Sequence, residues 1–190
     1  MTQSTSPTPW LDTLIIYNDV VHYYTNPFRH AAIATTGHGL HSHGNNPDRA
    51  QHTNYSHASV TKYLAEQAKI RDTILVRIKT TPSQEKAINR YMDSLANKST
   101  TMTDNSAMRT SDALRSAGLN VIRATFPETV NEEAIRSLHG TESRINKGEL
   151  GKAENFKSFD PNIEKGIEEG ETKAAEMIGN AEHSLNPKPQ

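Results

Sequence analysis

Cysteine is absent from this chain of 190 residues. Its absence excludes a disulfide framework, a metal site built on thiolates and a thiol nucleophile. Long apolar runs are absent as well: none approaches the roughly 20 residues that a helix needs to cross a bilayer, so we expect no transmembrane segment. Residues 1–9 carry neither the basic patch nor the apolar stretch of a secretory signal. We therefore expect a protein that is made in the cytoplasm without a signal peptide.

An excess of charge of one sign is also missing. The formal net charge is −1, and acidic and basic residues are interspersed along the chain. A nucleic-acid-binding domain would show a basic stripe, and a membrane-surface segment would show a polybasic run, so we expect neither partner. Apolar residues make up only 34% of the chain. That fraction predicts a single domain with part of the chain outside its core.

Histidine, in contrast, is abundant. Six of the nine histidines fall within 28 residues: His30, His38, His41, His43, His52 and His57. Imidazole serves both acid–base chemistry and metal binding. The spacing of His38, His41 and His43, with Asp48 as the nearest carboxylate, matches no recognised zinc signature. We therefore expect no metal and no cofactor, and a zinc site on these three histidines is the alternative.

Composition divides the chain into three parts. Residues 1–9 are rich in Ser, Thr and Pro and predict a disordered lead-in. Residues 10–127 carry the apolar periodicity of a folded domain. In residues 128–190 large apolar side chains become sparse, which predicts a polar, partly helical C-terminal extension with little to bury. The acidic segment 128–170 is expected to be solvated surface, with docking of a partner as the alternative.

Apolar patterns predict the secondary structure of the middle part. Strands are expected at 10–21, 28–34, 39–43, 73–79 and 120–126, and helices at 59–68, 82–95 and 105–117. Thr81, Pro82 and Gln84 form a capping box at the start of the second helix. The polar segment 44–55 is expected to be a loop. Strands and helices mixed in this order predict an α+β fold.

The third helix begins at a chemically useful place. Asp104 or Asn105 can cap it through a side-chain oxygen, which puts Ser106 in its first turn. Backbone N–H groups and the positive end of the helix dipole favour an anion there, and the same surroundings lower the pKa of a thiol. Gly118 is expected to end the helix. Position 106 is therefore a suitable place for a nucleophile, although this chain has serine there.

A nucleophile needs a base, and the base needs a group that orients it. His30, on the strand 28–34, is the best candidate for the general base. His41, on the returning strand of a hairpin, is the candidate for the orienting residue because it could bond the second ring nitrogen of His30. His43, Asn105 and His57 are secondary candidates, and His57 is expected to be a surface or loop residue.

These features occur in an order that resembles a known family. The segments are Phe28-Arg29-His30-Ala31-Ala32-Ile33-Ala34, Leu40-His41-Ser42, the strand 74–79, the helix from Pro82, and Asp104-Asn105-Ser106 followed by Ala113-Leu114-Arg115-Ser116-Ala117-Gly118. They resemble the circularly permuted NlpC/P60 branch of papain-like cysteine hydrolases. That branch has first a strand with the histidine, then a second polar residue about a dozen positions further on, and then a helix that begins with Asn-Cys. The resemblance implies an antiparallel sheet packed on the nucleophile helix.

The chain departs from the family at the nucleophile, where Ser106 replaces cysteine. An engineered, inactivated form and a naturally serine-bearing or inactive member both remain open. The resemblance implies cleavage of an amide bond by residue 106 and His30, with peptidoglycan stem peptides as the substrate of an amidase or endopeptidase. Lipid acyltransferases, thioesterases and protein deamidases are alternatives within the same fold, and a non-catalytic binding module is a third class.

A small hydrolase with a polar tail is similar to antibacterial toxins that a contact-dependent secretion machine delivers into rival cells. That likeness implies action in the periplasm of the target cell, an immunity protein that blocks the cleft, and a component of the secretion apparatus as a further partner.

Overall fold

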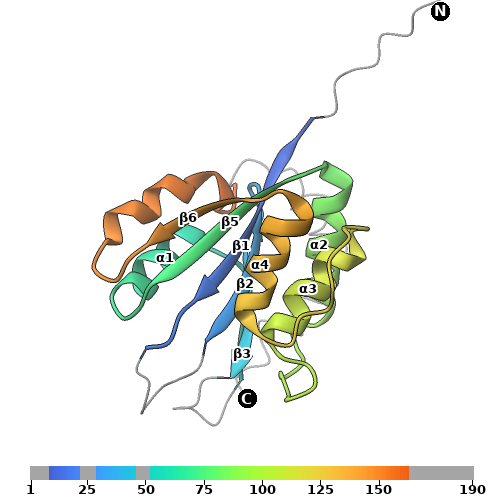
Figure 1. Ribbon diagram of the computed structural model, residues 1–190, viewed down its shortest axis with the longest axis horizontal. Helices are drawn as coiled ribbons and strands as arrows, with labels where there is room; N and C mark the ends of the chain where they lie inside the picture. The colour runs from blue at the N-terminus through green and yellow to red at the C-terminus, as the bar shows by residue number, and fades with distance from the viewer. Residues whose placement is uncertain (1–8, 22–28, 46–51, 163–190) are drawn as a thin grey trace, which may run out of the picture.

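The computed structural model describes residues 9–21, 29–45 and 52–162, and it has an α+β architecture with helices on both faces of one sheet (Figure 1). The elements in chain order are β1 (Leu11–Asn18), β2 (His30–Thr35), β3 (Gly39–Asn45), β4 (His52–Ala58), α1 (Val60–Ala68), β5 (Thr73–Thr80), α2 (Pro82–Ser94), α3 (Ser106–Ser116), α4 (Pro127–Leu138), β6 (Thr141–Ile145) and the 3₁₀ segment η1 (Leu150–Phe159). Residues 1–8 of the predicted lead-in, together with Phe28, Asp48 and residues 163–190, lie outside the described residues.

The sheet has six strands in the order β4-β3-β2-β1-β5-β6, and every neighbouring pair is antiparallel. Its centre is β1, whose residues from Thr13 to Asn18 are all buried. A strand with helices on both faces has no solvent side, so it carries a continuous apolar run in place of alternation. The run Leu14-Ile15-Ile16-Tyr17 is therefore the reason that β1 occupies the middle of the sheet.

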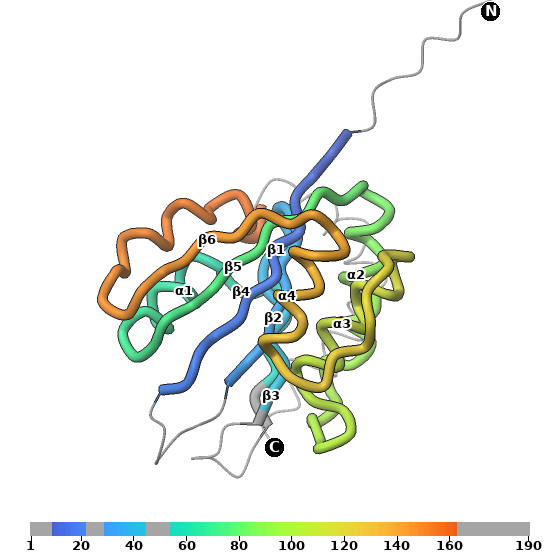
Figure 2. The backbone as a smooth tube through the Cα atoms, in the orientation of Figure 1, coloured from blue at the N-terminus to red at the C-terminus, as the bar shows by residue number. Residues whose placement is uncertain are grey.

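Helical segments lie on both faces of the sheet (Figure 2), and each face has its own core of buried side chains. Helices α2, α3 and α4 cover one face through Ile15, Ala31, Ile33, Val76 and Ile78. Helix α1 and η1 cover the other through Leu14, Ile16, Ala32, Ala34, Leu40 and Leu75. Adjacent residues of a strand point to opposite faces, which is why the two sets interleave in the sequence.

The predicted boundary after residue 127 does not separate two packing units. Helix α4 contributes Val130 and Ala134 to the first core. Strand β6 pairs with β5, and η1 places Phe156 and Phe159 in the second core. In the described part of this segment, residues 128–162, most of the large apolar side chains contribute to one of the two cores, so this part packs as an integral piece of the fold.

Two secondary-structure predictions are wrong. Residues 120–126 form no strand, because Ala124 donates its backbone N–H to Ser111 Oγ on α3 (3.0 Å) and pairs with no strand. The segment predicted as a loop contains β4, a polar strand at the edge of the sheet. An edge strand has little apolar surface to bury, so its sequence lacks the usual alternation.

The three predicted helices begin and end close to the expected residues. Ser59 caps α1, and Thr81 with Gln84 forms the capping box of α2. Gly118 adopts a positive φ of 78° after α3, and the N–H of Leu119 returns to Leu114 O at 3.2 Å. None of the helices within the described ranges combines the length and the apolar character that crossing a membrane requires.

Candidate functional site

Ser106 is the first residue of α3, as predicted. Asn105, not Asp104, is its N-cap: the side-chain oxygen of Asn105 accepts the N–H of Met108 at 2.9 Å. The side-chain amide of Asn105 donates to Thr125 O at 3.0 Å, which ties the helix start to the chain after the helix. Asn105 therefore positions the first turn and takes no part in proton transfer within this geometry.

The hydroxyl of Ser106 lies against strand β2 on the face that α2, α3 and α4 cover, whereas the His30 side chain points toward the other face, where it bonds Ser42. Ala31 donates its backbone N–H to Ser106 Oγ at 3.3 Å. Strands β2 and β3 are paired next to the hairpin turn, and the pair farthest from the turn is Ile33 with His41. Closer to the start of β2, the backbone N–H of Ala31 has no partner among the described residues of β3 and donates to Ser106 Oγ instead. The nucleophile position is thus held where β3 no longer pairs with β2, and it contacts the residue that follows the predicted base in the chain, not the imidazole itself.

The side chain of His30 has one hydrogen bond among the described residues, and its partner is Ser42. Its Nε2 atom lies 2.7 Å from Ser42 Oγ, twelve residues further along the chain. Burial, with a smaller contribution from the charge of Arg71, lowers the pKa of His30 to about 3. The ring is therefore neutral near pH 7, as a general base must be. The hydrogen bonds of the described residues do not include one between His30 and Ser106.

The role predicted for His41 needs correction. His41 pairs with Ile33 in the sheet and faces the same layer as α2, where its Nε2 meets Asn89 Oδ1 at 2.9 Å. Ser42, the next residue, faces the other layer and bonds His30. Ser42 therefore orients His30, and the family spacing of about a dozen positions was the signal that could have identified it.

His43 is bound to a buried arginine. The Nη1 atom of Arg109 donates to His43 Nδ1 at 3.0 Å, and Arg109 is completely buried. The guanidinium also forms a bidentate pair with Asp104, with distances of 3.0 and 2.8 Å. Burial, and then the charge of Arg109, lowers the pKa of His43 to about 4. His43 therefore serves the packing of α3 against β3.

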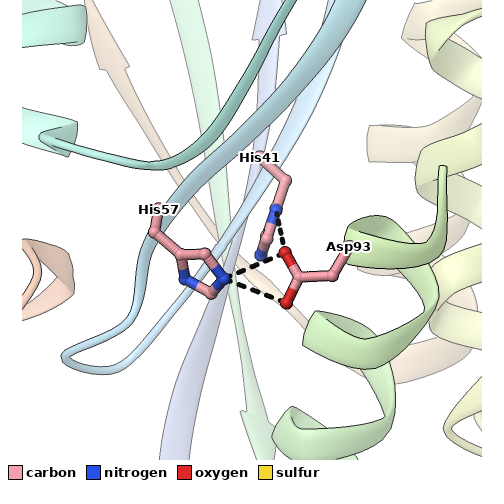
Figure 3. A group of neighbouring side chains, drawn as sticks. All are labelled: His41, His57 and Asp93. Carbon is pink, nitrogen blue, oxygen red and sulfur yellow. Dashed lines mark hydrogen bonds and ion pairs between the residues drawn. The ribbon is translucent and has the colours of Figure 1, made fainter. Parts of the chain in front are cut away.

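His57 lies at the end of β4 and takes part in a second group of polar side chains, with His41 and Asp93 (Figure 3). Its Nε2 atom lies 2.9 Å from Asp93 Oδ1. The sequence alternative of a zinc site on His38, His41 and His43 is not found among the described residues, where the group of side chains close enough to hold a metal is His41, His57 and Asp93. The backbone carbonyl of His38 accepts a hydrogen bond from His57 Nδ1 at 2.7 Å, and His43 is bound to Arg109. Of the three, only His41 belongs to the group that could hold a metal.

Comparisons of the chain with protein-family models, with curated proteins and with solved structures gave no match.

Proposed function

We propose that the chain carries a papain-like hydrolase site of the permuted NlpC/P60 type, with residue 106 in the nucleophile position and His30 as the general base. One observation supports the proposal: residue 106 opens α3 and its Oγ accepts the N–H of Ala31, the residue that follows His30. The His30 ring is bonded to Ser42 on the other face of the sheet, so the proposal requires this ring to turn around the end of β2 before it can serve residue 106. In the tautomer in which Nε2–H donates to Ser42, Nδ1 of His30 carries the lone pair that accepts a proton.

The chemistry expected of this arrangement is cleavage of an amide bond. Once the His30 ring has turned toward it, the group at position 106 gives its proton to His30 and attacks the carbonyl carbon, and His30 then protonates the departing amine. Water, activated by the same imidazole, hydrolyses the acyl group from residue 106 and restores the site. The positive end of α3 stabilises the oxyanion, because residue 106 opens that helix. A serine hydroxyl is a much weaker nucleophile than a thiolate unless a base activates it strongly, so the chain as it stands is expected to be inactive or slow.

The proposed substrate is the stem peptide of peptidoglycan, and the proposed role is that of a secreted antibacterial amidase or endopeptidase. The support is the order of the histidine strand, the Asn105-Ser106 helix start and the Ala117-Gly118 helix end in one chain. An immunity protein and a component of a secretion apparatus belong to the same proposal.

The test is the Ser106→Cys variant. Incubated with purified peptidoglycan, it should release new muropeptides that mass spectrometry detects, and the second substitution His30→Ala should abolish them. Ser42→Ala should lower the rate roughly 10- to 100-fold, because general-base catalysis of this size is lost with the orientation of the ring. Ser42→Thr, which keeps a hydroxyl, should restore much of it.

The matched control is Ser116→Cys, which places an exposed thiol at the other end of α3. Iodoacetamide should alkylate the thiol at 106 at lower pH than the thiol at 116, because a helix N-terminus lowers a thiol pKa. Identical alkylation profiles and no turnover would contradict the proposal. Turnover of a phospholipid, a thioester or a protein glutamine in place of peptidoglycan would keep the nucleophile and reassign the substrate.

A further inference from the structure

We propose that His41, His57 and Asp93 bind one Zn²⁺ ion. These side chains come from β3, β4 and α2 and point toward one another (Figure 3). One ligand atom from each lies within 4.8 Å of the other two. His57 Nε2 lies 2.9 and 3.0 Å from the two oxygens of Asp93, and His41 Nδ1 lies 3.9 Å from Asp93 Oδ1. Zinc bonds of about 2 Å put neighbouring ligand atoms roughly 3.3 Å apart, so small side-chain rotations suffice.

The hydrogen bonds around the two imidazoles determine which nitrogens are available. His41 Nε2 faces Asn89 Oδ1, and His57 Nδ1 faces the carbonyl oxygen of His38. Both oxygens can only accept, so these two nitrogens carry the hydrogens. In each neutral ring the remaining nitrogen then has a lone pair, and both of these nitrogens face Asp93.

Such an arrangement is typical of histidines that bind metal. A metal-binding histidine usually donates its second N–H to a carbonyl or carboxylate, which fixes the tautomer and the ring orientation. Here Asn89 and the backbone of His38 play that part. The Nδ1 atom of His41 is buried and has no hydrogen-bond partner. A buried nitrogen with an unused lone pair is costly unless a ligand occupies it.

The backbone is bent where it brings His57 into this group. Strand β3 has a register shift against β4 between Leu40 and Ser42, so Ser56 and His57 together lie opposite the single residue His41. His57 itself has a φ of 54°, a value uncommon outside glycine. Bulges of this kind redirect a side chain and are frequent next to functional sites.

Exposure gives the ion access to the site. The His41 side chain is fully buried, whereas those of His57 and Asp93 are 38% and 39% exposed. Two histidines and one carboxylate with one open side form the ligand set of zinc sites that keep a position for water. Imidazole nitrogen favours Zn²⁺ over Mg²⁺ or Ca²⁺, which prefer sites made of oxygen alone.

The experiment is a zinc titration of the full chain. The protein is treated with EDTA, dialysed at pH 7.5 and titrated with ZnCl₂ in a calorimeter. About one equivalent should bind, and zinc should raise the melting temperature, because an ion that binds only the folded state stabilises it. The chain contains no cysteine, so no thiolate can account for the binding.

Variants test the assignment. Asp93→Asn and His57→Gln should each weaken zinc binding by at least about 100-fold, and Asn89→Ala by about 10- to 100-fold. His139→Asn removes an exposed histidine that is not in the group and tolerates the positive φ of 55° at that residue, so it should bind zinc as the unaltered chain does.

The melting curve of each metal-free variant shows that it is folded before it is titrated. Sub-stoichiometric binding by the unaltered chain, or unchanged affinity in folded Asp93→Asn, would overturn the proposal. A proton shared between His57 and Asp93 would then be the only occupant of the group.

Discussion

Three imidazoles in this structure resist protonation. The pKa is lowered to about 3 for His30 and to about 4 for His41 and His43, in each case mainly through burial. A free imidazole has a pKa near 6.5. The three rings are therefore neutral at pH 7, which is the form in which His41 can bind a metal. A pKa of about 3 makes His30 a weak base while it stays buried against Ser42, so general-base catalysis by His30 requires a more exposed position of the ring.

These shifts predict that acid destabilises the folded chain well above the range in which carboxylates titrate. Between about pH 6.5 and pH 4 the unfolded chain binds protons at these three residues and the folded chain does not, so stability falls as pH falls. Each fully titrating histidine contributes a slope of up to about 1.4 kcal/mol per pH unit. Urea denaturation at pH 7.5, 6.5 and 5.5, with EDTA present, measures the free energy of unfolding. A value that stays constant over this range would contradict the burial of these rings.

Part of the site could be predicted from residue type and spacing. The cap at Asn105 and the glycine at 118 locate Ser106 at a helix start because capping is a local property. His57 and Asp93 are 36 residues apart in the chain, and their contact depends on a bulge in β4; neither feature leaves a local signal in the sequence. The role of Ser42 could not be predicted from residue type alone, because the sequence does not show which face of β3 meets His30.

At the scale of elements, Arg109 fixes α3 to the loop that precedes it. Its guanidinium donates to the carbonyl oxygens of Leu95, Lys98 and Ser99, in addition to Asp104 and His43. A planar, five-donor group can satisfy several acceptors at once, whereas a lysine ammonium is a single point of charge. The loop between α2 and α3 is therefore tied to the first turns of the helix that carries residue 106.

Replacement of Arg109 should thus be costly. Arg109→Met leaves several buried acceptors without a donor and should lower the free energy of unfolding by about 3–5 kcal/mol. Arg109→Lys should recover only a fraction of this loss, because it cannot reproduce the bidentate pair with Asp104. Urea denaturation of both variants measures the difference. Arg115→Met, at an exposed site on the same helix, is the control and should stay within about 0.5 kcal/mol of the unaltered chain.

At the scale of the whole molecule, η1 completes the second core. Phe156 and Phe159 are buried there, and the Arg77 guanidinium lies 5.1 and 5.0 Å from their ring centres. Asp160 accepts the N–H of Thr61 at 2.9 Å, which joins the end of η1 to the start of α1. The segment 150–160 is therefore an integral part of the fold that carries the candidate sites.

This packing predicts a large effect of a single aromatic truncation. Phe159→Ala should lower the free energy of unfolding by about 3–5 kcal/mol, because it removes a completely buried ring. Phe126→Ala is the matched control: its ring is 63% exposed, so the cost should stay below about 1 kcal/mol. Thermal and urea denaturation compare the two. Equal costs would show that η1 does not seal the second core.

Much of the architecture could be predicted from apolar periodicity. The α+β class, the hairpin of β2 and β3, the strand β5 and three of the helices were predicted because their patterns are strong and local. Strands β4 and β6 were missed, since both lie at the edges of the sheet and expose most of their side chains. The extension after residue 127 was predicted from composition alone. Composition shows that aromatic residues are sparse there, but it does not show where in the fold they lie.

Three consecutive residues of β3 serve three separate partners: His41 bonds Asn89, Ser42 bonds His30, and His43 bonds Arg109. A displacement of this short segment therefore changes all three contacts together. If zinc at His41 shifts β3, the orientation of His30 changes with it, and a molecule held by His30 must alter zinc affinity by the same factor. The alternation of side chains along a strand would then couple two chemically unrelated places in the protein.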